Sequence, residues 1–217
     1  MLLPALATPC GEPLSRQAQT LYRQIRQAVP PQPACQAPQI VSWALALPPV
    51  DPLAVLRWTH SPEQRHFYWE NPQQGEAIAA LGTTRLAAIE APDRFAQAQA
   101  WLNHLWAHCW AGGEQQRPFA GAHVFASFAF FATPPAHPAP FPRATLCLPQ
   151  FHIARRGQTS TLVINVDLQA PGEPETTLEQ CDRLLAWVDQ ARYPTPTAPP
   201  PPPPGLGPPP PAPFPPV

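Results

Sequence analysis

Two histidines in the middle of the chain have a spacing that could place both on one metal ion. His104 and His108 are four residues apart, so they share one face if this segment is helical. No glutamate follows the first histidine, so the spacing does not match the H-E-x-x-H pattern of metalloproteases. We therefore favour the interpretation that both histidines lie on the semi-polar flank of a packed helix.

The other reactive side chains do not complete a catalytic pattern. Glu70 follows three aromatic residues near the end of an expected strand, and no spacing identifies a partner for general acid–base catalysis. Ser127 lies in an apolar segment expected to be a buried strand and outside any G-x-S-x-G motif, which excludes a nucleophile elbow. Gly112, Gly113 and Gly121 do not form a phosphate-binding loop. We assign no catalytic, cofactor-binding or metal-ligating residue.

The chain contains no lysine, because all thirteen of its basic residues are arginines. Chemistry that needs a lysine amine as a base, a Schiff-base partner or a phosphate clamp is therefore absent from this polypeptide. The thirteen arginines are balanced by fourteen acidic residues. The resulting net charge of −1 excludes the broad basic surface of a nucleic-acid-binding protein.

The five cysteines are odd in number and contain no C-x-x-C pair, which argues against a disulfide framework or a cysteine zinc site. We expect reduced thiols in a cytoplasmic protein, with Cys109 and Cys147 as small buried apolar residues. The start of the chain lacks a signal-peptide pattern, and no apolar run is long enough to span a membrane.

Proline marks the domain organisation. Of the 37 prolines, fifteen fall within residues 194–217, including six in succession. This segment is expected to be a disordered, extended tail or linker, since proline removes the backbone donor and fixes φ. The prediction divides the chain into an N-terminal helical or irregular segment (residues 1–39), a folded domain (40–193) and the tail (194–217). The tail has many P-x-x-P patterns, so docking on a partner protein is an alternative to a plain linker.

Helix and strand patterns alternate in the remainder, which predicts an α+β fold of mixed antiparallel sheets flanked by helices. The expected helices are residues 14–29, 51–58, 92–110 and 177–190, and the expected strands are residues 40–47, 66–71, 77–81, 84–91, 124–132, 143–155 and 159–166. Gly82 is expected in a hairpin or bulge between two strands, and residues 156–158 (R-G-Q) in a second hairpin.

Four helix and strand features are more specific. On the 92–110 helix, the apolar stripe is Phe95, Ala98, Leu102, Leu105 and Cys109, and a glycine pair at 112–113 is expected to end the helix. Residues 124–132 are nearly all apolar, which predicts a strand buried on both faces. The last helix is expected to have Thr176 or Thr177 as its N-cap. Its apolar face is expected to contain Leu178, Cys181, Leu184, Leu185 and Val188.

Four stretches resemble the N-terminal part of isochorismate synthases. They are S-P-E-Q-R-H-F-Y-W-E-N at 61–71, A-I-A-A-L-G at 77–82, F-A-G-A-H-V-F-A-S-F-A-F at 119–130 and R-A-T-L-C-L-P at 143–149. Their order and spacing agree with the family, although Ala120 stands where the family usually has the first of two glycines. The resemblance covers about residues 41–192 and extends to the wider group of chorismate-utilising enzymes.

The resemblance implies a two-lobed α+β sandwich and Mg²⁺-dependent conversion of chorismate to isochorismate, for isoprenoid-quinone (menaquinone or phylloquinone) or siderophore synthesis. In that family a lysine activates water, a glutamate acts as general acid, and further glutamates hold Mg²⁺. All of them belong to a C-terminal half that has no counterpart here, so none can be carried over to this chain. We expect the chain alone to be inactive, to bind no Mg²⁺, and to bind chorismate only with a catalytic half.

Three hypotheses remain open. The chain is the N-terminal part of a truncated or frameshifted isochorismate synthase gene, or a sequence fragment of one; or it docks, as one part of a split enzyme or as a regulatory subunit, on a separately encoded catalytic half. In the third hypothesis, it is an unrelated binding module with a proline tail. Under the first hypothesis, the whole enzyme could also be a salicylate synthase. The absence of an L-L-E-S motif argues against an anthranilate synthase. An incomplete sandwich leaves strand edges unpaired, which predicts an exposed apolar face and poor solubility.

Overall fold

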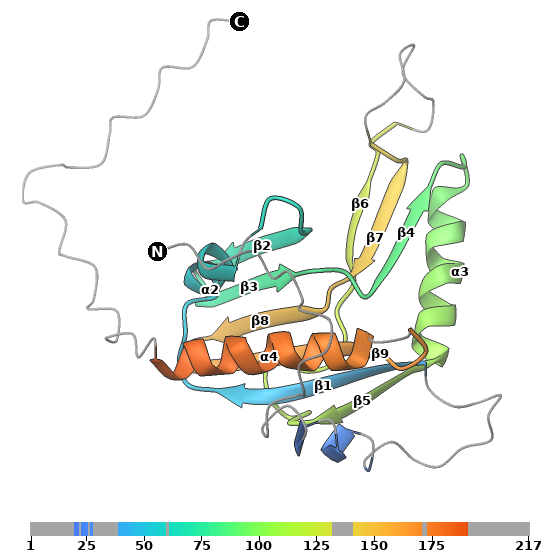
Figure 1. Cartoon of the computed structure of the whole chain (residues 1–217). Coiled ribbons are helices and arrows are strands. Elements are labelled where there is room, and N and C mark those ends of the chain that lie inside the picture. The colour runs from blue at the N-terminus through green and yellow to red at the C-terminus, as the bar shows by residue number, and fades with distance from the viewer. Residues whose placement is uncertain are drawn as a thin grey trace, which may run out of the picture.

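Two sheets, one of six strands and one of three, form the framework of this α+β protein, and this confirms the expected fold class. The computed structural model describes residues 20, 21, 23–25, 27, 39–59, 61–131, 141–170 and 173–190. The strands of the small sheet run steeply across those of the large sheet (Figure 1). The proline-rich tail and most of the expected helix at 14–29 lie outside the described residues, although Leu21 and Ile25 are helical and buried.

The large sheet has the strand order β2-β3-β8-β9-β1-β5. Its strands are, in chain order, β1 (Ile40–Leu47), β2 (His66–Asn71), β3 (Glu76–Leu81), β5 (Cys109–Gly113), β8 (Phe151–Arg156) and β9 (Thr159–Asp167). Neighbouring strands are antiparallel except β1 and β5, which are parallel. The expected hairpin at residues 156–158 is confirmed between β8 and β9, where Gly157 takes φ of +58°.

Two helices, α2 (Pro52–Thr59) and α4 (Glu173–Gln190), lie over the same face of the large sheet (Figure 1). The expected apolar face of α4 is confirmed, because Leu178, Cys181, Leu184 and Val188 are buried against the sheet and Leu185 is partly buried. On the strands, this core consists of Val41, Leu47, Phe151, Ile153, Leu162, Ile164 and Val166. The large sheet thus contains most of the buried apolar surface of the described residues.

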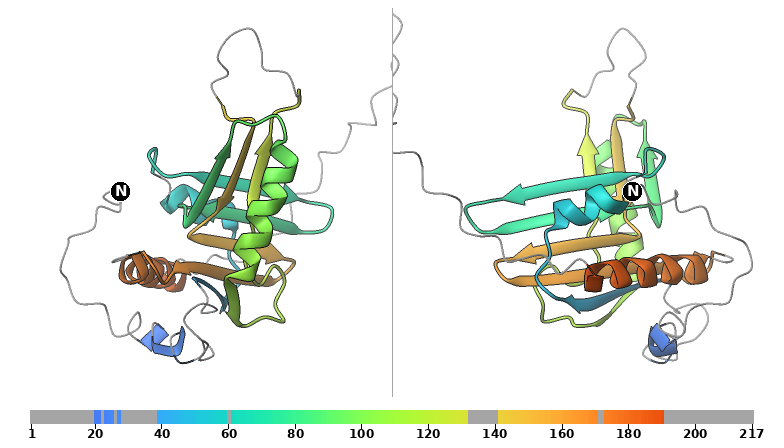
Figure 2. Two further views of the ribbon diagram at one scale, coloured as in Figure 1. Left: turned by 90° about the vertical axis from the view of Figure 1, so that its right-hand side faces the viewer. Right: turned by 60° about the vertical axis from the view of Figure 1, so that its left-hand side comes forward.

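The small sheet has the order β4-β7-β6, with β4 (Arg85–Ile89), β7 (Ala144–Leu148) and β6 (Phe125–Phe128). Helix α3 (Arg94–Ala107) lies along one face of this sheet (Figure 2, left). Ala98 and Leu105 are buried there, close to β7. No described helix covers the opposite face. No helix in the described part of the chain is long and apolar enough to cross a membrane.

The end of α3 differs from the prediction of a helix to residue 110. The helix ends at Ala107, and the carbonyl of His108 accepts hydrogen bonds from the amides of Gln39 and Ile40 at 2.9 and 3.1 Å. This contact brings the chain alongside β1, so the next residues form β5 instead of another helical turn. Gly113 ends that strand, with φ of +78° and no room for a Cβ beside the backbone of Ala44.

The predicted stripe on α3 is also wrong at its two ends. Phe95 is exposed and Cys109 belongs to β5, whereas the side chain of Arg94 is buried.

The prediction that residues 124–132 form a strand buried on both faces is wrong as well. The strand is β6, it lies at the edge of the small sheet, and Ala126 to Phe128 are exposed. An apolar composition indicated burial there, but no described element supplies the covering surface.

Two predicted strand connections need correction. Gly82 does not form a hairpin, because β3 and β4 belong to different sheets and the chain passes between the sheets at this glycine. Likewise, residues 143–155 form two strands, β7 and β8, which are separated at Pro149 and lie in different sheets. The breaks at Gly82 and Pro149 are therefore two of the connections between the sheets, and we call these two the crossovers.

The expected N-cap of the last helix is also wrong, since α4 begins at Glu173 and Thr177 lies within it.

Cys109 and Cys147 are only half-buried, whereas Cys181 is fully buried, so the expectation of burial is wrong for the first two. Burial nevertheless raises the pKa of the Cys109 thiol to about 11, which keeps it protonated at neutral pH.

Candidate functional site

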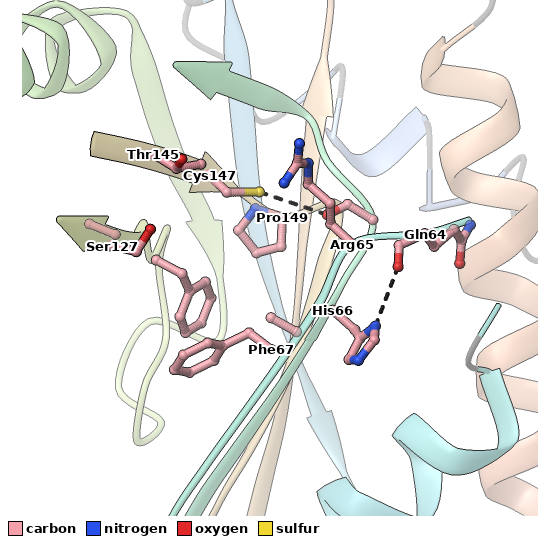
Figure 3. Close-up of a pocket in the computed structure, with 12 residues that line it drawn as sticks. Gln64, Arg65, His66, Phe67, Ser127, Thr145, Cys147 and Pro149 are labelled. Carbon is pink, nitrogen blue, oxygen red and sulfur yellow. Dashed lines mark hydrogen bonds between the residues drawn. The ribbon is translucent and has the colours of Figure 1, made fainter. Parts of the chain in front are cut away.

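A cavity of about 390 Å³ lies between the two sheets, beside the crossovers that join them (Figure 3). One wall comes from the start of β2 and the end of β3, and the other from β6 and β7. The cavity is lined by Gln64, Arg65, His66, Phe67, Ala80, Gly82, Phe125, Ala126, Ser127, Thr145, Cys147 and Pro149. Its position follows from the topology, because the two sheets diverge from the crossovers and leave space between them.

Hydrogen bonds between the crossovers fix this end of the cavity. The amide of Thr84 donates to the carbonyl of Leu148 at 2.8 Å, and its hydroxyl donates to the carbonyl of Asn165 at 3.0 Å. The side-chain amide of Asn165 donates to the carbonyl of Pro149 at 2.8 Å. Gly82 has φ of +70°, and a Cβ at this position would collide with the side chain of Gln150. The local sequence therefore permits the chain to turn from one sheet to the other.

An aromatic pair bridges the two walls. The rings of Phe67, from β2, and Phe125, from β6, have centroids 4.3 Å apart. Both side chains line the cavity, and Phe67 remains exposed. The rings are tilted by 36°, and the pair provides an apolar contact surface for a ring-shaped or aliphatic group.

The polar groups of the cavity are suited to binding. They comprise one guanidinium, one imidazole, two hydroxyls, one side-chain amide and one thiol, and none of the twelve lining residues is Asp or Glu. The thiol of Cys147 lies 3.6 Å from the Thr83 hydroxyl and 4.0 Å from the Gly82 carbonyl oxygen. His66 Nδ1 lies 3.3 Å from the Gln64 carbonyl oxygen. Without a carboxylate beside a base, the cavity contains no general acid–base pair of the kind that hydrolases use.

The structure places the histidine candidates together but outside the cavity. The rings of His104, in the last turn of α3, and His108, directly after the helix, have centroids 4.4 Å apart, and His108 Nδ1 lies 2.8 Å from the carbonyl oxygen of His104. Within the described ranges, no group of three or more His, Cys, Asp or Glu residues is placed to hold a metal ion. The described residues thus do not fit the Mg²⁺ site that the resemblance implies for the whole enzyme.

The other two candidates have different surroundings. Glu70 is exposed on β2 and accepts a 2.9 Å hydrogen bond from the hydroxyl of Tyr68. Partial burial, and then this carboxylate, raise the pKa of Tyr68 to about 12. Ser127, expected in a buried strand, lines the cavity instead. Residue types alone gave no signal for the other polar lining residues, because they come from two distant segments, 64–66 and 145–147, that only the topology brings together.

A buried histidine lies on the face of the large sheet opposite to α2 and α4. His152 Nε2 lies 3.0 Å from the carbonyl oxygen of Phe119, which has φ of +58°, and its Nδ1 has no hydrogen-bond partner. Burial, and then the neighbouring His123, lower the pKa of His152 to about 3. The ring is therefore neutral at pH 7 and donates from Nε2, and it holds the segment around Phe119 against β8.

Comparison with known proteins identifies the family of this chain. A family model described as chorismate binding enzyme matches residues 23–203, whereas no curated protein matches the sequence. Among solved structures, the chain is similar to the menaquinone-specific isochorismate synthase MenF from Escherichia coli, with 18% identity and a TM-score of 0.45. That match covers 79% of this chain but 33% of the synthase, so the chain spans about a third of its length. Because the family match extends over most of its residues, the chain belongs to the chorismate-binding enzyme family.

Proposed function

We propose that this chain is the N-terminal, non-catalytic part of an isochorismate synthase, which converts chorismate to isochorismate for isoprenoid-quinone or siderophore synthesis. The observation that carries the proposal is a chorismate-binding enzyme sequence of 217 residues without a single lysine. Membership of the family supports the substrate class. The resemblance of four sequence stretches, in the same order as in isochorismate synthases, supports the particular reaction.

Without a lysine, this chain does not supply the catalytic base of an isochorismate synthase. In isochorismate synthases, a lysine activates the water that attacks the ring of chorismate. Arginine is a poor replacement, because its guanidinium keeps its proton at any physiological pH. The cavity between the sheets also lacks a carboxylate that could protonate the departing hydroxyl. The base, the acid and the Mg²⁺ ligands would therefore come from a second lobe.

The open face of the small sheet supports a second lobe. Leu86 is 42% exposed on the face opposite to α3, where Phe125 and Cys147 lie in register with it on β6 and β7. Exposed apolar surface of this kind marks a contact site for another folded unit. In the proposal, the second lobe packs on this face, and the cavity with its aromatic pair lies at the junction. The free thiols of Cys109, Cys147 and Cys181 suit a reducing compartment, and we place the protein in the cytoplasm.

The test measures chorismate turnover by the purified chain in the presence of Mg²⁺. We expect no isochorismate or salicylate above the uncatalysed background from the chain alone. Addition of a separately produced, lysine-bearing chorismate-binding lobe, translated from the downstream DNA or a neighbouring gene, should yield isochorismate. The control is the same lobe with its lysine replaced by methionine. Turnover by the chain alone would contradict the proposal, and salicylate as the product would change the assigned reaction.

A further inference from the structure

The outer edge of β6 lacks the features that usually protect a strand edge. β6 is an edge strand of the small sheet, with only β7 beside it, and Ala126 to Phe128 are exposed. Residues 118–142 contain no Asp, Glu, Lys or Arg. Two of the other edge strands are better protected, since β2 contains Glu70 and β4 begins with Arg85. Proteins commonly use charged residues to prevent two identical edges from pairing, and β6 has none.

The hydrogen-bond register identifies which groups of β6 are free to pair. The amide of Ala129 donates to the carbonyl of Arg143 at 2.8 Å, so Ala129 directs its backbone groups toward β7. Ser127 and Phe125 follow the same alternation, since they lie opposite Thr145 and Cys147. The backbone N–H and C=O groups of Ala126 and Phe128 therefore point away from the sheet. They form a short row of donors and acceptors for another strand.

Five exposed phenylalanines lie near the C-terminal end of β6. We call them the phenylalanine patch: Phe95, Phe128, Phe130, Phe131 and Phe141. The rings of Phe95 and Phe128 stack at 4.9 Å, and those of Phe130 and Phe131 meet edge to face at 5.1 Å. At about 150–250 Å² per aromatic side chain, rings with 41–90% exposure present roughly 500–850 Å² of apolar surface. A stable protein interface buries about 800 Å² on each partner.

We propose that β6 pairs with β6 of a second copy of this chain, antiparallel across a two-fold axis, so that the two small sheets become one continuous sheet. A pair centred on Ser127 places Ala126 of one copy opposite Phe128 of the other, and these two residues exchange their free backbone hydrogen bonds. The phenylalanine patches of both copies then lie at this joint.

Charge favours a second copy as the occupant. In a two-fold pair, every residue of one edge meets a residue of the same strand, so any charge near the axis would face a like charge. The uncharged segment around β6 removes this repulsion, and the net charge of −1 leaves little repulsion between whole molecules. The proposal is independent of the proposed function, because pairing requires neither chorismate nor a second lobe.

The first test compares two substitutions at Ala126 by sedimentation velocity and light scattering of the purified full chain. Ala126→Pro removes an outward-pointing amide and leaves the bonds to β7 in place, whereas Ala126→Thr keeps the amide and suits a strand. We expect a dimer for the wild type and for Ala126→Thr, and at least a tenfold weaker dimer for Ala126→Pro. A monomeric wild type at tens of micromolar would overturn the proposal.

The second test guards against a variant that merely fails to fold. Ser127→Arg and Ser127→Glu each place two like charges across the axis, so each should be mainly monomeric with a circular dichroism spectrum like that of the wild type. An equimolar mixture of the two should form a heterodimer, because an arginine then faces a glutamate. Failure of the mixture to associate would overturn the proposed axis. Slower hydrogen exchange at the Phe128 amide in the dimer would support it, and equal exchange in dimer and monomer would contradict it.

Discussion

The two sheets of this protein contain similar apolar sequences, but they are covered to different extents. Every residue of β3 and all but the first residue of β9 are buried, because the large sheet is covered by α2 and α4 on one face and faces the rest of the protein on the other. The small sheet has a single helix, on one face, and β6 is mostly exposed. An apolar strand composition therefore indicates that the strand packs against another surface, but not whether that surface belongs to the same chain.

Thiol reactivity should show the largest contrast between the sheets. Cys181 is buried against the large sheet, and burial raises the pKa of its thiol, whereas Cys147 of the small sheet is half-buried at the cavity. We expect Cys147 to react with a neutral alkylating reagent more than about a thousandfold faster, since modification of Cys181 requires unfolding. Peptide mass spectrometry after timed labelling measures both rates. Comparable rates would show that the large sheet opens as readily as the small one.

Truncation of one side chain in each sheet sharpens the comparison further. Ile164→Ala in β9 removes a fully buried side chain and should lower the free energy of unfolding by about 2–5 kcal/mol. Leu86→Ala in β4 removes a side chain from the open face and should lower it by less than about 1 kcal/mol. Urea denaturation followed by circular dichroism measures both values. A large loss from Leu86→Ala would mean that the open face is covered in solution.

Acidification should destabilise the large sheet through His152. Its pKa is about 3 in the folded chain but about 6.5 when unfolded, so the unfolded state binds more protons between these values. Stability therefore falls as the pH drops below about 6.5, by about 2 kcal/mol at pH 5. His152→Gln keeps a donor for the Phe119 carbonyl and should lack this part of the pH dependence. Identical pH profiles of the two proteins would exclude a neutral buried ring.

An ion pair joins the two sheets and should make a modest contribution to stability. Arg85 in β4 contacts the buried carboxylate of Asp167 in β9 at 2.7 Å. Arg85→Ala leaves that carboxylate with the amide of Gln169 as its partner and should cost about 1–2 kcal/mol. Arg85→Lys, which keeps the charge, is the matched control. If Arg85→Ala and Arg85→Lys unfold at the same urea concentration, the ion pair does not couple the sheets.

Local sequence signals predicted elements well but not their partners. The strand at β1, the β8–β9 hairpin and the apolar face of α4 follow from alternation, glycine placement and helical spacing, which are local properties. The strand β5 was missed because its pairing with β1 depends on residues some seventy positions earlier. The cavity was missed for the same reason, since Phe67 and Phe125 meet only after the sheets form.

The position of β1 between β9 and β5 affects how the protein is made. Leu47 pairs with Ser160, roughly 110 residues later in the chain, and a ribosome adds that many residues in about 6 to 22 s at 5–20 residues per second. During this interval, the apolar strand has left the ribosome without its antiparallel neighbour, while the β2–β3 hairpin can already close. Nascent chains stalled before β9 should therefore be the ones that chaperones bind most strongly.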